Sequence, residues 1–325
     1  MLQPTLASLF SGGGLFDVGA EQAGYKAVYG IEIVSAFAST YAKNLGNHIQ
    51  CESVFDTDFA ELEHRYIEHL HASPVCKNVS GANAYKGERP TDIEAIESTL
   101  RAIAVAKPNT ITIENVPRYA KTQSFHNLVS GLSRRGYRYV FDTLNTADFG
   151  VPQTRKRLIL VASRISEPSL PMPTHAPMAS DRFMKWVTWY EAISDLIPTL
   201  EPTKLASWQQ DRLRDVPRQP CLIPKDGAPT RNKLNPRPQD QPCLTLRALG
   251  GDGHWQQFIL AMPAANSGWV YYTLSTRALA RLQTVPDSYV LPYQNSIACQ
   301  IIGNGIPCTF SRAIMQHVYN GFVYS

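Results

Sequence analysis

The sequence predicts an α/β fold, in which a doubly wound, mostly parallel sheet is accompanied by a small irregular domain. Short apolar runs alternate with segments of helical spacing over residues 1–168. A proline-rich stretch follows, and helical spacing returns near the C-terminus. We therefore expect three segments along the chain, at 1–168, 169–234 and 235–325.

The first elements form a strand–turn–helix unit. The apolar run TLASLF (5–10) ends in the glycine turn SGGG (11–14), and residues 16–24 have helical spacing with Gly24 at the expected C-cap. Further strands are expected at 27–32, 66–72, 109–114, 137–144 and 157–163. Helices between them are expected at 34–44 and 91–106. Strands that alternate with helices of this length favour a parallel sheet.

The segment after residue 168 has a different character. Residues 169–242 are rich in prolines and turn formers, with one helix expected near 187–196. Helical spacing returns at 271–286 and at 307–323. The C-terminus is therefore expected to fold back onto the first domain.

Composition excludes several classes of protein. The chain is 44% hydrophobic and 18% charged, as soluble globular proteins are. Its first residues do not have the pattern of a signal peptide, and no run approaches the roughly 18 apolar residues of a membrane span. We therefore expect an intracellular protein.

Charge is unevenly distributed along the chain. Residues 1–100 hold 6 Lys/Arg and 13 Asp/Glu, whereas residues 101–168 hold 11 and 4. A basic middle beside an acidic start suggests a face suited to a polyanion. A solvated basic face without a partner explains the same pattern, so charge alone does not decide.

The six cysteines do not form a recognisable metal or disulfide pattern. They are scattered, without a CxxC pair or neighbouring histidines, at Cys51, Cys76, Cys221, Cys243, Cys299 and Cys308. No metal site is therefore predicted, and most of these thiols are expected to be small buried side chains.

Polar residues follow several of the predicted strands. The glycine turn lets a ligand approach the backbone, and Glu32 ends the second strand, where it can accept hydrogen bonds from ribose hydroxyls. Asp17 stands where the third glycine of GxGxxG would be, which disfavours a dinucleotide and leaves nucleoside ligands open. A tight turn that serves packing only is the alternative.

A second group of polar residues lies at the ends of later strands. Cys76 follows a strand and Pro74, and a lone cysteine there is more often buried than catalytic. Glu114 and Asn115 end another strand and place a carboxyl and an amide at the same edge. Alternate spacing in an extended segment puts three further side chains on one face, those of Gln153, Arg155 and Arg157.

Taken together, these motifs resemble the DNA (cytosine-5) methyltransferase family. The segments that carry the resemblance occur in the family's order as FSGGG, SPVC, ENV, QTRKR, RLQTVPDSY and IGNGIP. They span about residues 6–164 and 235–320, and 169–234 falls where the family keeps its target-recognition domain. The resemblance implies the Rossmann-like fold of S-adenosylmethionine-dependent methyltransferases.

The resemblance also implies a reaction. Cys76 would attack C6 of a flipped cytosine, and Glu114 would protonate or hydrogen-bond N3. C5 would then take the methyl group of S-adenosylmethionine, giving S-adenosylhomocysteine. Arg155 is expected near the base's O2, with Asn115, Gln153 and Arg157 in the catalytic scaffold.

Binding residues follow from the same resemblance. Those expected at the cofactor are Phe10, Ser11, Gly12, Gly14, Leu15, Glu32, Ile33, Ser53, Pro74, Asn304, Gly305 and Ile306. Those expected at DNA are Lys77, Ser80, Arg212, Arg214, Arg218, Arg231 and Arg247. Tryptophans and a lysine of the recognition segment are further possible contacts, at Trp186, Trp189, Trp208 and Lys233.

The implied partner is double-stranded DNA, bound by a monomer in the cytoplasm at the nucleoid. Both a solitary enzyme and one paired with a companion restriction endonuclease are compatible with the sequence.

The chain departs from the family pattern at two places. The usual Pro-Pro-Cys-Gln is here Pro74-Val75-Cys76-Lys77, which loses one rigid residue and gains a cation that can favour the thiolate or contact a phosphate. An acidic residue expected near the adenine is here Ser53, so adenine contacts are the least defined part of the cofactor site.

Three alternatives remain. A transfer-RNA cytosine-5 methyltransferase shares the catalytic motifs, although its Pro-Pro-Cys signature matches poorly. A catalytically silent DNA-binding relative is disfavoured by Cys76, Glu114 and the QTRKR segment. A nicotinamide oxidoreductase is disfavoured by the missing third glycine.

Overall fold

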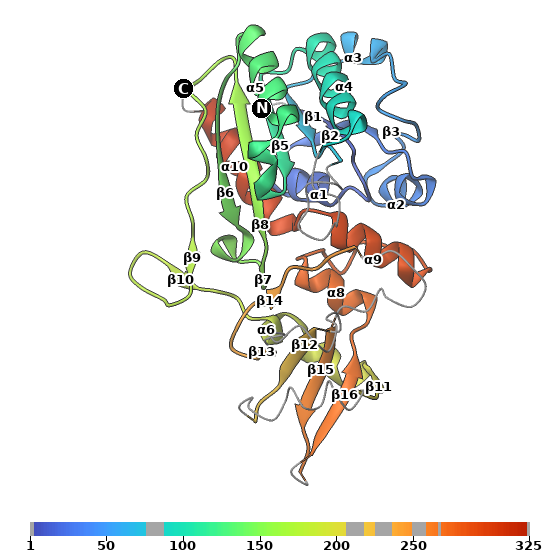
Figure 1. Cartoon of the computed structure of the whole chain (residues 1–325), viewed down its shortest axis with the longest axis vertical. Helices are drawn as coiled ribbons and strands as arrows, with labels where there is room; N and C mark the ends of the chain where they lie inside the picture. The colour runs from blue at the N-terminus through green and yellow to red at the C-terminus, as the bar shows by residue number, and fades with distance from the viewer. Residues whose placement is uncertain are drawn as a thin grey trace. The chain divides into compact units, whose positions relative to one another are not determined.

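The computed structural model describes residues 3–75, 88–205, 218–224, 236–248, 258–265 and 268–323 (Figure 1). The chain divides into two compact units. Unit 1 consists of Met1–Asn145, Lys156–Met172 and Ile306–Ser325, and unit 2 of Thr146–Arg155 and Pro173–Gly305. Among the residues described, no helix is long and apolar enough to cross a membrane.

Unit 1 is built on a seven-stranded sheet of order β3-β2-β1-β4-β5-β8-β6. Its strands are β1 (Thr5–Leu9), β2 (Lys26–Ile31), β3 (Ile49–Gln50), β4 (His69–Ala72), β5 (Thr110–Asn115), β6 (Arg138–Asn145) and β8 (Lys156–Ser163). The first five strands in this order are parallel to one another, and β8 is antiparallel to both β5 and β6. The predicted doubly wound, mostly parallel sheet is therefore confirmed.

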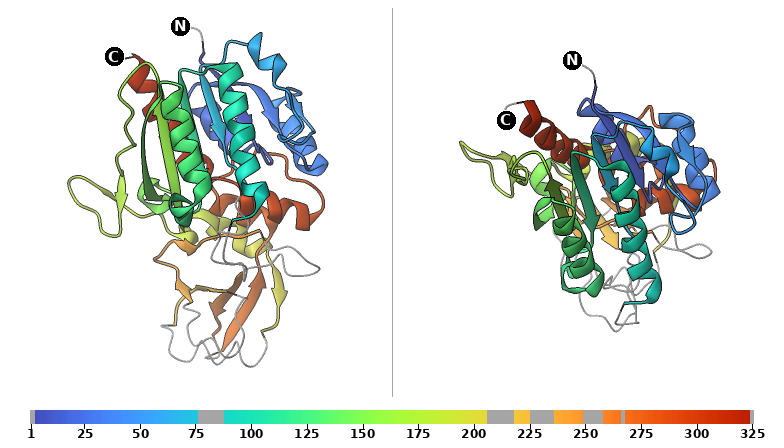
Figure 2. Two further views of the ribbon diagram at one scale, coloured as in Figure 1. Left: turned by 45° about the horizontal axis from the view of Figure 1, so that its top comes forward. Right: turned by 90° about the horizontal axis from the view of Figure 1, so that it is seen from above.

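Helices cover both faces of this sheet. They are α1 (Leu15–Gln22), α2 (Ser35–Leu45), α3 (Ala60–Glu63), α4 (Pro90–Ala106), α5 (Gln123–Arg134) and α10 (Cys308–Val323), with a 3-10 turn η1 (Pro117–Lys121). Figure 2 shows α4 and α5 over one face of the sheet and α10 on the opposite face. The central strands β4 and β5 are buried along their whole length, as strands covered on both faces must be. Leu9, Ile31 and Ile113 are fully buried in the core between these layers.

Helices α1 and α10 pack closely at Gly19. A Cβ atom added there would lie 1.9 Å from the Ser311 Oγ and 2.3 Å from the Cys308 carbonyl oxygen. The second of these atoms is backbone and cannot move aside by changing a rotamer. The predicted C-terminal helix at 307–323 is therefore present, and it belongs to the same compact unit as the sheet.

This close contact gives a stability prediction. Gly19→Ala is expected to lower the free energy of unfolding by about 1–3 kcal/mol, because overpacking forces the two helices apart. Denaturant unfolding measures this loss. Gly321→Ala in α10, where an added Cβ meets no described atom within 4 Å, is the control and should not destabilise. Equal unfolding midpoints for the two variants would contradict the close packing.

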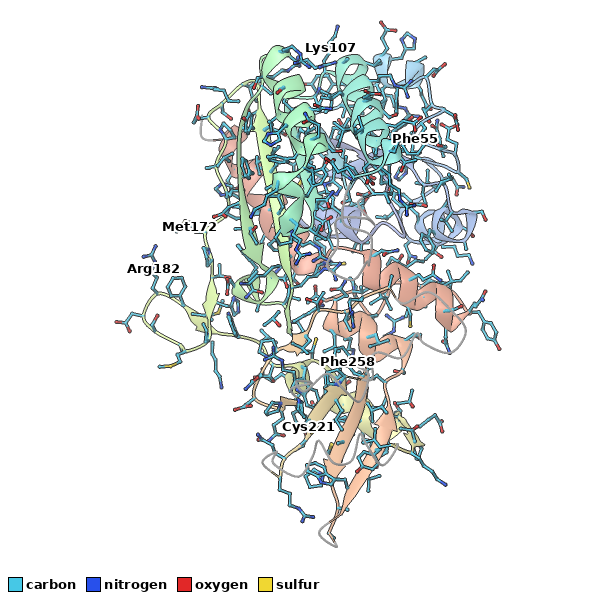
Figure 3. All side chains as sticks on the ribbon, viewed as in Figure 1. Phe55, Lys107, Met172, Arg182, Cys221 and Phe258 are labelled. Atoms are coloured by element: carbon cyan, nitrogen blue, oxygen red, sulfur yellow. The ribbon has the colours of Figure 1, made fainter. Side chains whose placement is uncertain are left out.

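Unit 2 contains a five-stranded antiparallel sheet of order β11-β16-β15-β12-β13. Its strands are β11 (Glu201–Thr203), β12 (Cys221–Pro224), β13 (Arg237–Pro238), β15 (Phe258–Pro263) and β16 (Trp269–Thr273). Cys221 and Phe258, labelled in Figure 3, both belong to this sheet. Leu205, Cys221, Ile223, Ile259 and Ala261 form a small core on it.

The remaining elements of unit 2 are short. They are η2 (Thr146–Phe149), β7 (Gln153–Thr154), β9 (His175–Ala176), β10 (Met184–Lys185), α6 (Trp189–Ile193), η3 (Ser194–Thr199), β14 (Cys243–Leu244), α8 (Thr276–Leu282) and α9 (Asn295–Asn304). Strand β14 pairs in parallel with β7.

One predicted helix was wrong in part. Residues 271–286 do not form a single helix, because the segment through Thr273 is the end of β16 and pairs with β15. Helix α8 begins only after Ser275, whose Oγ accepts a hydrogen bond from the Ala278 N–H as an N-cap. Residues 235–305 lie in unit 2 together with most of 169–234. The limits of the recognition domain at 169 and 234 stay a prediction.

Candidate active site

The FSGGG turn after β1 contains three residues with a left-handed backbone. Phe10, Gly12 and Gly14 have φ values of 57°, 56° and 81°. A Cβ added at Gly14 would lie 2.4 Å from the Leu45 Cδ1 and 2.8 Å from the Tyr41 Cδ2, so packing and the positive φ both favour glycine there. A Cβ at Gly12 would meet no described atom within 4 Å. Gly12 is therefore the point at which a ligand can approach the backbone.

Glu32 closes this turn from the end of β2. Its side chain is buried, and the carboxylate accepts hydrogen bonds from the Gly12 N–H at 2.9 Å and the Val34 N–H at 2.8 Å. Burial raises the pKa of Glu32, while these backbone hydrogen bonds lower it. Each carboxylate oxygen has further acceptor capacity. The arrangement can therefore accept hydroxyl donors from a ribose.

An apolar surface lies beside this acid. Ile33 is 65% exposed and follows Glu32 directly. In the sheet order the direction of winding reverses between β1 and β4, and ligands of open α/β sheets bind at such a point. Gly12, Glu32 and Ile33 therefore offer a backbone approach, a diol acceptor and an apolar platform, which together fit a nucleoside.

A buried polar network connects the glycine turn to β1, α1 and α2. The Asp17 carboxylate in α1 accepts hydrogen bonds from the Ser8 Oγ at 2.7 Å and from the Tyr41 hydroxyl at 2.5 Å. The Ser8 and Ser11 hydroxyls are 2.7 Å apart. Burial raises the pKa of Asp17 to about 7, against the opposite effect of its two hydroxyl donors. The sequence signal for this network was an acid in the otherwise apolar first turn of α1.

The other expected cofactor residues have mixed placements. Leu15 is buried in the first turn of α1, and Ser53 is partly buried with its Oγ accepting from the Phe55 N–H. In unit 2, Asn304 is exposed at the end of α9, and the Gly305 carbonyl accepts from the Gln283 Nε2. Ile306 is buried in unit 1.

The carboxyl end of β5 carries an acid paired with a cation. The Arg157 Nε donates to the Glu114 Oε1 at 2.8 Å, and the two side chains are only 14% and 10% exposed. Burial lowers the pKa of Arg157, and the Glu114 carboxylate opposes that shift. Because β5 pairs with β8, the register places Glu114 opposite Ile159, two residues after Arg157.

The segment before Cys76 is fixed to the same strand end. The Asn115 Nδ2 donates a buried hydrogen bond of 3.0 Å to the Pro74 carbonyl oxygen. The carboxyl ends of β1, β2, β4 and β5 point the same way, since these strands are parallel. Unit 1 thus presents the glycine turn, Glu32, Pro74 and Glu114 along one edge of its sheet.

Gln153 and Arg155 belong instead to the interior of unit 2. The Gln153 Nε2 donates to the Gln283 Oε1 at 2.6 Å, and its Oε1 accepts from the Leu246 N–H at 2.8 Å. Arg155 is 1% exposed and donates to the Leu246 carbonyl at 2.6 Å and the Gly303 carbonyl at 3.0 Å. These contacts hold β7 to two distant segments of its own unit.

This placement differs from the expected division of roles. Arg155 was expected at the base and Arg157 in the scaffold. The structure gives the scaffold contacts to Arg155 and pairs Arg157 with the predicted acid, Glu114. The reason is that Arg155 lies between β7 and β8, which belong to different sheets, so alternate spacing does not continue from Gln153 to Arg157.

Several expected residues lie outside the described residues, namely Cys76, Lys77, Ser80, Trp208, Arg212, Arg214, Arg231 and Lys233. Arg218 is exposed and donates to the Ala264 carbonyl oxygen, and Arg247 is exposed. Trp189 is fully buried and donates its Nε1 to two carbonyl oxygens, and the Trp186 Nε1 donates to Asp148. Both tryptophans therefore have structural partners.

Four of the five described cysteines are buried and are therefore poor nucleophiles. Burial raises the pKa of Cys221, Cys299 and Cys308 to about 12 and that of Cys243 still further. Cys51 is exposed after β3. The expectation that most thiols are small buried side chains is confirmed for these four. In the described parts of the chain, no group of three or more His, Cys, Asp or Glu residues could hold a metal ion.

Known proteins resemble the chain along nearly its whole length. A family model described as C-5 cytosine-specific DNA methylase matches residues 5–320. The Type II methyltransferase M1.HphI of Haemophilus parahaemolyticus is 25% identical, over 97% of this chain and 86% of that protein. M.AplI of Arthrospira platensis, also a Type II methyltransferase, is 26% identical with the same coverage. The structure of the S. pombe Dnmt2 methyltransferase, 15% identical, has a TM-score of 0.70 and covers 99% of this chain and 100% of its own, which shows a shared fold.

Proposed function

Because the chain belongs to the C-5 cytosine-specific DNA methylase family, we propose that it transfers a methyl group from S-adenosylmethionine to C5 of a cytosine in double-stranded DNA. The names of the curated relatives, which are Type II methyltransferases, favour a sequence-specific DNA target. The observation that carries the proposal is the Glu114–Arg157 pair, at the same sheet edge of unit 1 as Gly12 and Glu32.

The proposed chemistry begins with a nucleophile. C5 of cytosine is itself a poor nucleophile, so the Cys76 thiolate adds to C6 and breaks the 5,6 double bond. The electron pair is drawn toward N3, where Glu114 shares a proton with the ring. Once C5 carries the methyl group, a base takes the C5 proton, the electron pair reforms the 5,6 double bond, and the bond from C6 to Cys76 breaks to release the thiolate. The base must leave the duplex for this, so base flipping is part of the proposal.

Arg157 is the proposed cation beside the base. Its guanidinium holds the Glu114 carboxylate at 2.8 Å and has further N–H donors that can reach the ring's O2. The pairing keeps the carboxylate in one orientation. Arg155, in contrast, is proposed as a scaffold residue because two carbonyl oxygens hold its side chain.

The glycine turn and Glu32 are the proposed cofactor site. When bound, S-adenosylmethionine supplies an electrophilic methyl group on a sulfonium. Gly12 lets the cofactor approach the backbone, and Glu32 accepts hydrogen bonds from the ribose hydroxyls. Ile33 covers the adenine ring of the cofactor. These residues therefore fit a nucleoside-bearing cofactor without a pyrophosphate.

Glu32→Ala is expected to weaken cofactor binding about 10- to 100-fold, because it removes charged hydrogen bonds to the ribose. Titration calorimetry with S-adenosylhomocysteine measures the change. The exposed acid Glu63 in α3 offers a control, since Glu63→Ala should leave affinity unchanged. An unaltered affinity in Glu32→Ala would place the ribose elsewhere.

Sequence choice is proposed to reside in 169–234. Arginine paired with guanine is the commonest base contact, whereas contacts to phosphates only position the duplex. Single substitutions at Arg212, Arg214, Arg218 or Arg231 should therefore divide into two kinds. Some should weaken binding to all DNA, and at least one should relax choice at one base pair by about 1–3 kcal/mol. Methylation mapping of each variant tests this, and shifts caused only by changes inside 1–164 would contradict it.

The substrate class is tested by incubation with labelled S-adenosylmethionine and separate pools of DNA and transfer RNA. Base analysis should find 5-methylcytosine in DNA. Label in transfer RNA alone would favour the RNA-modifying branch of the superfamily. No label in either pool, with DNA still bound, would indicate a catalytically silent relative.

A further inference from the structure

Two buried histidines of β4 lie in the centre of unit 1. His69 and His71 are 0% and 3% exposed and occupy alternate positions, so they face the same side of the sheet. Strand β5 pairs His69 with Thr110 and His71 with Thr112. Polar side chains at such central positions require hydrogen-bond partners, because leaving them without any would be costly.

A continuous hydrogen-bonded chain supplies these partners. From the buried end to the sheet edge it runs Thr110 Oγ1–His69 Nδ1 (2.7 Å), His69 Nε2–Thr112 Oγ1 (2.9 Å), Thr112 Oγ1–His71 Nδ1 (2.9 Å) and His71 Nε2–Ser73 Oγ (3.0 Å). A neutral imidazole has one donor and one acceptor nitrogen, so every link can be satisfied in either direction of the chain. Burial lowers the pKa of His69 to about 3 and that of His71 well below its usual range, which keeps both rings neutral.

His71 is the residue at which three functional segments meet. Its Nε2 contacts Ser73, which stands three positions before Cys76. Its Nδ1 contacts Thr112, two positions before Glu114 on the same strand. Its ring stacks on Phe16 with centroids 3.4 Å apart and an interplanar angle of 7°. Phe16 lies in the first turn of α1, directly after the glycine turn.

The segment before Cys76 is therefore held from two sides. His71 holds the Ser73 hydroxyl, and Asn115 holds the Pro74 carbonyl oxygen. Only one proline precedes the cysteine here, because Val75 stands between Pro74 and Cys76. A hydrogen bond from a buried ring can restrain a segment that lacks a second rigid residue.

We propose that His71 and Ser73 are positioning residues that set the approach of the Cys76 segment relative to Glu114 and to the cofactor turn. The inference rests on the proposed function and adds residues that neither the QTRKR segment nor the glycine turn contains. Neither residue touches the base. Each acts through the backbone that leads to the nucleophile.

Two variants remove the contact in different ways. His71→Phe keeps an aromatic ring on Phe16 and removes both hydrogen bonds, whereas Ser73→Ala removes a single hydroxyl from the partly buried end of the chain. Thr110→Val is the matched control, because it removes a single hydroxyl from the opposite, buried end with little change in shape. The wild type, these three variants and the His71→Phe/Ser73→Ala double variant are compared for kcat and cofactor KM on cytosine-containing DNA, and for thermal unfolding.

Ser73→Ala and His71→Phe are expected to lower kcat about 10- to 100-fold, as a misplaced reacting group does, with cofactor KM unchanged. The double variant should be no worse than the poorer single one, since both remove the same contact. Thr110→Val should lose stability but keep the kcat of the folded protein. If His71→Phe fails to fold, the kcat of Ser73→Ala alone tests the proposal.

Two results would overturn the proposal. Wild-type kcat in Ser73→Ala, or a loss of kcat in Thr110→Val equal to that in Ser73→Ala, would show that the hydrogen-bonded His–Thr chain serves stability only. A wild type that binds DNA and S-adenosylmethionine without methylating would instead refute the proposed function, and this inference with it.

Discussion

Cys76→Ser is expected to reduce methyl transfer to background while DNA and cofactor binding persist. A serine hydroxyl is a far weaker nucleophile than a thiolate, and the reaction cannot begin without addition to C6. Incorporation of labelled methyl groups into DNA measures the loss, and a DNA-binding assay shows that the variant is intact. Among the described cysteines, four have thiols whose pKa burial raises to about 12 or beyond.

The matched control is Cys51→Ser, which changes an exposed thiol of the same unit. It should retain wild-type turnover. If Cys76→Ser still methylates at a rate near that of the wild type, the nucleophile is assigned to the wrong residue. If Cys51→Ser is the inactive variant, the exposed thiol is the nucleophile.

Glu114→Gln is expected to lower turnover by about 10²-fold or more, the range that a positioned acid contributes. Glutamine keeps the shape and some hydrogen bonding but cannot share a proton with N3. The change also leaves the largely buried Arg157 guanidinium without its carboxylate, so a loss of stability should accompany the loss of turnover. Cofactor affinity should change little, because Glu32 and Gly12 are untouched.

Steady-state kinetics and thermal unfolding, measured on the same preparations, separate these two effects. Asp142→Asn is a suitable control, since Asp142 is an exposed acid on strand β6 of the same sheet. It should keep both turnover and stability. Equal turnover in Glu114→Gln and the wild type would show that another group carries the proton at N3.

The sequence predicted best what depends on local geometry. The glycine turn, Glu32 and the ends of β4 and β5 were all found from short apolar runs followed by polar residues, because a parallel sheet brings such ends to one edge. The Glu114–Arg157 contact was not predicted. It depends on the register of β5 against β8, which is a tertiary property.

Two further features were missed for physical reasons. His69 and His71 alternate with apolar residues, a pattern typical of a strand with one solvated face, yet both are buried. Their partners are threonines some 40 residues later, which no local pattern links to them. Likewise, the antiparallel sheet of unit 2 pairs segments far apart in the chain, such as β11 with β16. Its many prolines indicated turns rather than strands.

The central claim is that cytosine is methylated through a covalent bond between Cys76 and C6, and covalent trapping tests it most directly. DNA that carries 5-fluorocytosine at the target should stall the reaction after methyl transfer, because fluorine cannot leave as a proton does. We expect an adduct that survives denaturation and whose peptide mass maps to the segment containing Cys76. An adduct on any other residue, or methylation of ordinary DNA without any adduct on the fluorinated DNA, would contradict the claim.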